Sequence, residues 1–151
     1  MHTQEWASRE HLAGDPLLVA AVLAAPPVWW LLAPLVGTAR SGDLATVLMV
    51  VVLYPVLEEL SFRGLLQGWL LQRLGGRHWS ASWRISLPNL LTSLAFAAAH
   101  LPTQPIAWAA ATLAPSLLFG FLRERYDSLL PPMALHIYYN AGLLLFVLYV
   151  Q

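Results

Sequence analysis

The sequence predicts an all-α fold, a polytopic transmembrane helical bundle of about five spans with kinked or broken helices. Hydrophobic residues make up 58% of the 151-residue chain and charged residues only 11%, with a mean hydropathy of +0.61. Soluble domains carry more charge and less apolar surface. Apolar segments also recur at about the 20-residue length that a helix needs to cross the hydrocarbon core of a bilayer.

The first two predicted spans contain prolines in their interiors. The first runs from about residue 16 to 36, and its three prolines predict kinks or a broken helix. The polar segment before it lacks the basic and cleavable regions of a signal peptide, so we expect this span to remain as an anchor. The second runs from about 44 to 74, longer than a bilayer is thick, and Pro55 predicts a bend in it.

Three shorter spans are predicted at about 87 to 101, 106 to 122 and 130 to 150. Pro102 and Pro105 predict a turn after the first of these, and Pro131 and Pro132 suit the first turn of the last. The link from 74 to 86 is predicted to lie at the membrane interface as a loop or short helix. We expect one domain over residues 1–151.

The arginines predict the orientation, because the chain contains no lysine. If the spans alternate, one side carries six arginines and the other only Arg40. Those six are Arg9, Arg73, Arg77, Arg84, Arg123 and Arg125. Positively charged loops stay in the cytoplasm, so the amino terminus is predicted to be cytoplasmic.

Composition also excludes some functions. The chain has no cysteine, which excludes a thiolate nucleophile, a thiolate metal site and a disulfide framework. The formal net charge is zero and no basic run is present, so nucleic acid is not an expected partner.

The second predicted span carries Glu58, Glu59 and Arg63 in an otherwise apolar stretch. Charged side chains at bilayer depth are costly, and they mark a functional site by default. Glu59 and Arg63 are four residues apart, as in a helical ion pair. Glu58 points about 100° away from Glu59 on a helix and has no such partner.

Other predicted spans contribute His100, His136 and Asn140. A carboxylate with an imidazole can hold and deprotonate a water, and a second imidazole with an amide can stabilise the resulting oxyanion. Taken singly, the ion pair is better explained as structural, and each histidine can equally be structural or functional. The joint pattern in separate apolar spans favours a hydrolytic site.

Three short motifs resemble those of a known family. The segment EELSFRG is similar to the EExxxR motif, FAAAH to the FxxxH motif and HIYYN to the HxxxN motif of the CPBP intramembrane proteases. That family includes the CAAX prenyl endopeptidases and bacteriocin-processing proteins. The resemblance covers about residues 51–142 and has the motifs in the family's order.

The resemblance implies a role for each matching position. Glu58 would activate the water and His100 would assist it, whereas His136 and Asn140 would stabilise the oxyanion. Glu59 and Arg63 would shape the site. The implied activity is intramembrane, glutamate-dependent cleavage of a peptide bond near the C-terminus of a membrane-associated protein.

The class of substrate is implied only broadly. It would be a CAAX-type protein or one with a C-terminal sorting tail, as for the small myxosortases of this family. The expected partners are therefore a membrane-associated protein or peptide and the bilayer. The expected location is the bacterial inner membrane.

Two alternatives have different chemistry. A zinc peptidase could use two histidines and a glutamate, although the chain has no HExxH helix, so we expect no metal and no other cofactor. A membrane binding or immunity protein could keep the fold without catalysis, but it would not need an unpaired buried acid.

Overall fold

The computed structural model describes residues 15–36, 43–75 and 85–150, and every element in these ranges is a helix. The chain divides into two compact units. One comprises residues 1–41 and 141–151, and the other residues 42–140. The helix α8 (Leu130–Val150) passes from the second unit into the first.

The first unit contains α1 (Pro16–Val36) and the end of α8. Buried alanines on α1 leave room for close packing, and a Cβ added at Gly142 would overlap the Trp29 ring. The helix continues through Pro26 and Pro27, so the alternative of a broken first helix is wrong. Each proline removes only its own backbone donor, and in an apolar segment the remaining backbone groups still need helical partners.

The second predicted span is one continuous helical stretch, Leu44–Leu74. Its parts are α2 (Leu44–Leu48), η2 (Met49–Leu53), α3 (Tyr54–Glu58), η3 (Glu59–Gln67) and α4 (Gly68–Leu74). The two η segments are π-helical, with backbone hydrogen bonds that reach five residues along the chain. The helix accommodates Pro55 by this wider turn, directly before α3.

The start of this stretch is capped by Asp43, whose Oδ1 accepts a hydrogen bond from the Thr46 backbone at 2.8 Å. The backbone hydrogen bond from Thr46 lowers the pKa of Asp43. At the other end the chain leaves the helix at Gly75, which has a φ of 66°.

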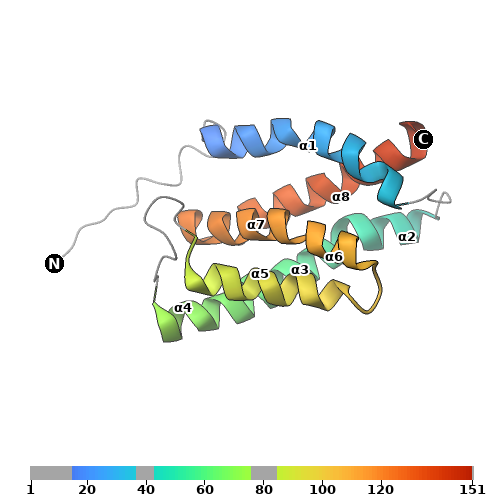
Figure 1. Cartoon of the computed structure of the whole chain (residues 1–151). Coiled ribbons are helices and arrows are strands. Elements are labelled where there is room, and N and C mark those ends of the chain that lie inside the picture. The colour runs from blue at the N-terminus through green and yellow to red at the C-terminus, as the bar shows by residue number, and fades with distance from the viewer. Residues whose placement is uncertain (1–14, 37–42, 76–84, 151) are drawn as a thin grey trace. The chain divides into compact units, whose positions relative to one another are not determined.

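Three further helices complete the second unit with the first part of α8. They are α5 (Leu87–His100), α6 (Ile106–Ala111) and α7 (Leu113–Tyr126). In Figure 1, α5 lies beside α7 and beside the second span, and these elements are in contact. Ser86 caps α5 by accepting a hydrogen bond from the Asn89 backbone.

Four helical stretches in the described ranges are long and apolar enough to cross a membrane. They are Pro16–Ala33, Leu44–Leu74, Ile106–Tyr126 and Leu130–Leu148. The predicted third span differs, because α5 has only 14 residues and reaches about 21 Å. The predicted interfacial link, with Arg77 and Arg84, lies mostly outside the described residues.

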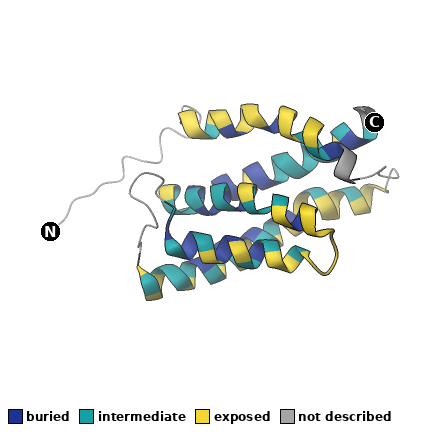
Figure 2. Ribbon diagram, viewed as in Figure 1, coloured by how far each residue is buried: buried dark blue, intermediate teal, exposed yellow. Residues whose placement is uncertain are grey.

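Burial in the second unit runs opposite to that of a soluble domain. Several polar side chains, among them Glu59, Arg63, Gln67 and Asn89, are fully buried. Large apolar side chains such as Leu65 instead face outward, as the yellow outer faces of the helices in Figure 2 show. An apolar exterior around a polar interior is the arrangement expected where the surroundings are lipid.

Candidate active site

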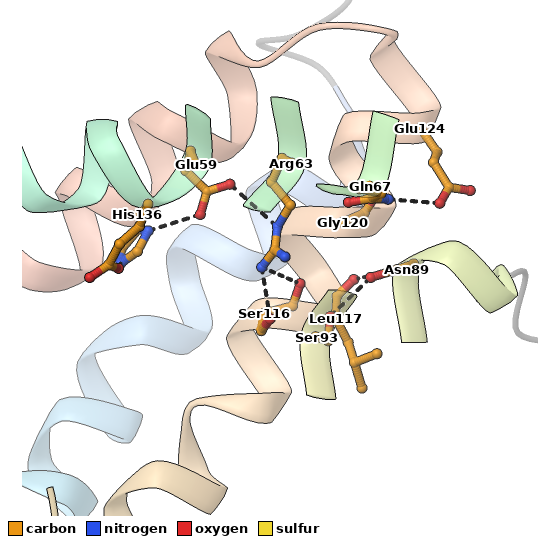
Figure 3. Close-up of polar contacts among 11 residues, drawn as sticks. Glu59, Arg63, Gln67, Asn89, Ser93, Ser116, Leu117, Gly120, Glu124 and His136 are labelled. Atoms are coloured by element: carbon orange, nitrogen blue, oxygen red, sulfur yellow. Dashed lines mark hydrogen bonds and ion pairs between the residues drawn. The ribbon is translucent and has the colours of Figure 1, made fainter. Parts of the chain in front are cut away.

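The site begins with a buried ion pair on η3. Arg63 Nε lies 3.4 Å from Glu59 Oε2, so the ion pair that their four-residue spacing predicted is present. Both side chains are fully buried. Arg63 Nη2 also donates hydrogen bonds to Ser116 on α7, at 3.1 Å to the carbonyl and 2.7 Å to the hydroxyl (Figure 3). Ser116 was missed by the sequence analysis, although a serine in an apolar helix is itself a signal. These contacts fix Arg63 between two helices.

His136 on α8 lies against both glutamates. Its Nδ1 is 2.9 Å from Glu59 Oε1, and its Nε2 is 3.6 Å from Glu58 Oε2. An ionised Glu59 beside Arg63 only accepts hydrogen bonds, so the imidazole donates from Nδ1. We call Glu58, Glu59, Arg63 and His136 the acid–histidine cluster. The bond from His136 to Glu59 was not expected from the sequence.

The two adjacent glutamates differ in exposure. The Glu58 side chain is 32% exposed, whereas that of Glu59 is 0% exposed. Glu58 is thus the carboxylate of the pair that another molecule can reach. Glu59 is enclosed between Arg63 and His136 (Figure 3).

Two phenylalanine rings hold the imidazoles in place. Phe119 stacks on His136, with ring centroids 4.8 Å apart and planes inclined by 24°. Phe96 lies 6.0 Å from His136 and 4.7 Å from His100, with the Arg63 guanidinium 5.2 Å from its ring centroid. Phe119 is another residue that the sequence analysis missed.

His100 approaches the same acid from α5. Its Nδ1 lies 2.8 Å from the Phe96 carbonyl, so this nitrogen carries a hydrogen, and in the neutral imidazole Nε2 is an acceptor. Both His136 and His100 are close enough to Glu58 to act on its charge. The structure therefore brings Glu58, His100 and His136 together from three helices.

Asn140 bonds to backbone, unlike Glu58 and His136, whose side chains face each other. It lies one turn after His136 on α8, and its Nδ2 donates a hydrogen bond to the Val50 carbonyl at 3.0 Å. The structure thus ties the fourth predicted site residue to the backbone of η2.

A second group of buried polar residues lies further along the same helices. Gln67 Nε2 donates to the Gly120 carbonyl at 3.0 Å and to Glu124 Oε1 at 2.8 Å. Ser86 Oγ also donates a hydrogen bond to Glu124 Oε1. Asn89 Nδ2 donates to the Leu117 carbonyl, and Ser93 Oγ donates to Asn89 Oδ1. Figure 3 shows these residues apart from Ser86. We call Gln67, Ser86, Asn89, Ser93 and Glu124 the Gln67–Glu124 network. It joins η3, α5 and α7.

The network was missed by the sequence analysis, but two signals mark it. Gln67 is four residues after Arg63 and eight after Glu59, which places all three on one buried stripe of the second span. Gly120 leaves space for a side chain from α5, because a Cβ there would overlap Asn89.

The chemistry of the cluster is that of acid–base groups. Within the described ranges, no group of three or more histidine, aspartate or glutamate side chains is arranged to hold a metal ion. A reachable carboxylate close to two imidazoles and next to a buried ion pair can bind and deprotonate a water.

Comparison with known proteins identifies the family. The family model for type II CAAX prenyl endopeptidase Rce1-like proteins matches residues 40–142, more than half of the chain and including all three motifs. Comparisons with curated proteins and with solved structures found no match. The matched range contains every residue of the acid–histidine cluster, together with His100 and Asn140. The chain belongs to the type II CAAX prenyl endopeptidase Rce1-like family of membrane proteases.

Proposed function

We propose that the chain is a glutamate-dependent intramembrane endopeptidase that hydrolyses a peptide bond near the C-terminus of a membrane-associated protein. The observation that supports this proposal best is the difference in burial and pairing between the adjacent acids Glu58 and Glu59. Glu59 is fully buried and paired, whereas Glu58 is partly exposed, lies 3.6 Å from the His136 imidazole and is close enough to His100 to interact with it electrostatically.

In the proposed mechanism Glu58 removes a proton from a water, and the oxygen of that water adds to the scissile carbonyl. His100 bonds to the Phe96 carbonyl through Nδ1, and in its neutral form it assists by accepting a hydrogen bond from the same water at Nε2. Glu58 then returns the proton to the leaving amine as the carbon–nitrogen bond breaks. Atoms and charge balance without a covalent acyl-enzyme.

His136 and Asn140 are proposed to stabilise the oxyanion. To donate from Nε2 while Nδ1 remains bonded to Glu59, the imidazole must carry both hydrogens. Glu59 thus has a role distinct from Glu58, because its hydrogen bond to Nδ1 holds the imidazole that is proposed as the oxyanion donor.

The substrate is proposed to be a CAAX-type protein or one with a C-terminal sorting tail, presented at the bacterial inner membrane. The amino terminus is proposed to be cytoplasmic. We propose that no metal takes part, so activity should survive a chelator. Loss of activity with a chelator and its return with zinc would favour the zinc peptidase instead.

The proposal is tested by comparing the C-termini of membrane-associated proteins in the native host by mass spectrometry. Glu58→Gln keeps the size of the side chain and removes the base, so one class of proteins should retain an unprocessed tail. Asp127→Asn is the matched control, because this exposed acid pairs only with Arg123 among the described contacts. Unchanged C-termini with folded Glu58→Gln protein would contradict catalysis and favour a binding protein.

A further inference from the structure

The backbone carbonyl of Val50 lacks a backbone hydrogen-bond donor because the residue five positions later is Pro55. In η2 the hydrogen bonds reach five residues along the chain, and the Tyr54 N–H donates to the Met49 carbonyl. The corresponding donor for Val50 would be residue 55, which is proline and has no N–H. Tyr54, the donor that an α-helix would use, is already engaged with Met49.

An unpaired carbonyl is costly at this place. Val50 lies within the candidate membrane span Leu44–Leu74, where a backbone group without a partner costs several kcal/mol in lipid. The Asn140 amide supplies the missing donor, with Nδ2 at 3.0 Å from the Val50 carbonyl. A carbonyl accepts only from the nitrogen side of an amide, so this bond also sets the orientation of the Asn140 side chain.

We propose that Pro55 is a positioning residue for Asn140: by removing one backbone donor it leaves the Val50 carbonyl to the Asn140 amide, and so fixes that amide one turn from His136. One N–H of Nδ2 is used by Val50, and the other has a fixed direction. The catalytic consequence rests on the proposed function, but the hydrogen bond itself does not.

The chain offers a direct spectroscopic test, because Asn89 and Asn140 are its only asparagines. Protein labelled with ¹⁵N-asparagine should give two side-chain amide pairs, assigned with Asn140→Ala. Pro55→Ala restores a backbone N–H that can bond to the Val50 carbonyl, so the Asn140 pair should lose the downfield shift of its bonded proton. The Asn89 pair, bonded to the Leu117 carbonyl, should not move.

Two further variants serve as controls for this experiment. Pro55 is buried, so Pro55→Val, which keeps most of the volume and also restores the N–H, covers the case in which Pro55→Ala does not fold. Pro26→Ala replaces an exposed proline inside α1 and should leave both amide pairs in place. An Asn140 pair that does not move in either Pro55 variant would overturn the inference.

Kinetics then test the consequence for the reaction. Pro55→Ala should lower kcat about tenfold with KM unchanged, as expected for a misplaced catalytic group. In the Asn140→Ala background it should cause no further fall, because the residue that it positions is gone. Additive losses would show that Pro55 acts elsewhere and would overturn the positioning role.

Failure of the two proposals is distinguishable. A wild-type protein without peptidase activity would contradict the proposed function, while the amide spectrum would still decide whether Pro55 directs Asn140. A shifted amide pair with unchanged kcat in an active enzyme would instead reject the catalytic consequence.

Discussion

The acid–histidine cluster and the Gln67–Glu124 network are both buried polar groups, yet only one of them presents a reactive group. In the cluster Glu58 is 32% exposed and lies 3.6 Å from the His136 imidazole, with His100 also close enough to interact with it. In the network the one carboxylate, Glu124, accepts hydrogen bonds from Gln67 and Ser86, and the amide of Asn89 bonds to backbone. The network contains no imidazole and no ion pair among the described contacts.

The difference separates two uses of polarity inside a membrane bundle. Interhelical hydrogen bonds, such as those that Gln67, Ser86 and Asn89 donate in the network, hold helices together. Buried charges cost much more, so a protein keeps them where chemistry needs them. Substitutions in the network should therefore affect stability, whereas those in the cluster should affect both stability and activity.

The largest expected effect comes from breaking the buried ion pair with Arg63→Met. This change leaves the fully buried Glu59 without its cation and removes both hydrogen bonds to Ser116. We expect a loss of about 3–5 kcal/mol of stability, measured by unfolding in mixed detergent micelles, together with loss of activity. Arg73→Met, which removes an exposed arginine on α4, is the control and should change little.

A compensating change sharpens this test. Adding Glu59→Gln to Arg63→Met removes the stranded charge, so stability should recover in part. Activity should not recover, because His136 then lacks the carboxylate that orients it. Equal losses in the single and double variants would show that the charge pair is not what stabilises η3.

The next largest effect is expected in the network. Gln67→Leu removes the donor to the Gly120 carbonyl and to Glu124, and Glu124 keeps only its hydrogen bond from Ser86. We expect a loss of about 1–3 kcal/mol of stability, with activity per folded molecule retained. Gln72→Leu on the exposed face of α4 is the matched control. A loss of kcat in folded Gln67→Leu protein would contradict the division between the two regions.

The sequence predicted the helices well because apolar length and proline positions are local signals. The bounds of α1 and α8 agree with the predicted ones, since α1 begins at Pro16 and α8 begins at Leu130, directly before Pro131, each after a polar segment. The third span was overestimated, because apolar character shows burial or lipid contact but does not show that α5 crosses the bilayer. The π-helical turns were not predicted either, since they depend on the pairing of individual backbone groups.

Side-chain partners on other helices were harder to predict. Spacing along one helix predicted the pair Glu59 and Arg63, but it gives no information about which residue of α7 or α8 faces that pair. Ser116 and Phe119 come from α7 and have no motif of their own, and Asn140 bonds to the Val50 carbonyl, whose π-helical donor position is occupied by Pro55. The roles of Glu58, His100, His136 and Asn140 in catalysis stay predictions.

The smallest expected effect concerns Phe119, which packs against His136 of the acid–histidine cluster. Phe119→Leu keeps an apolar side chain but removes the ring that stacks on His136, an interaction of about 1 kcal/mol. We expect kcat to fall severalfold with little change in KM, because the imidazole keeps its bond to Glu59 but gains freedom to tilt. Phe121→Leu on the same helix is the control, since the Phe121 ring lies near Arg125. If both variants lower kcat equally, general loosening of α7 explains the loss, and stacking on His136 does not orient the imidazole.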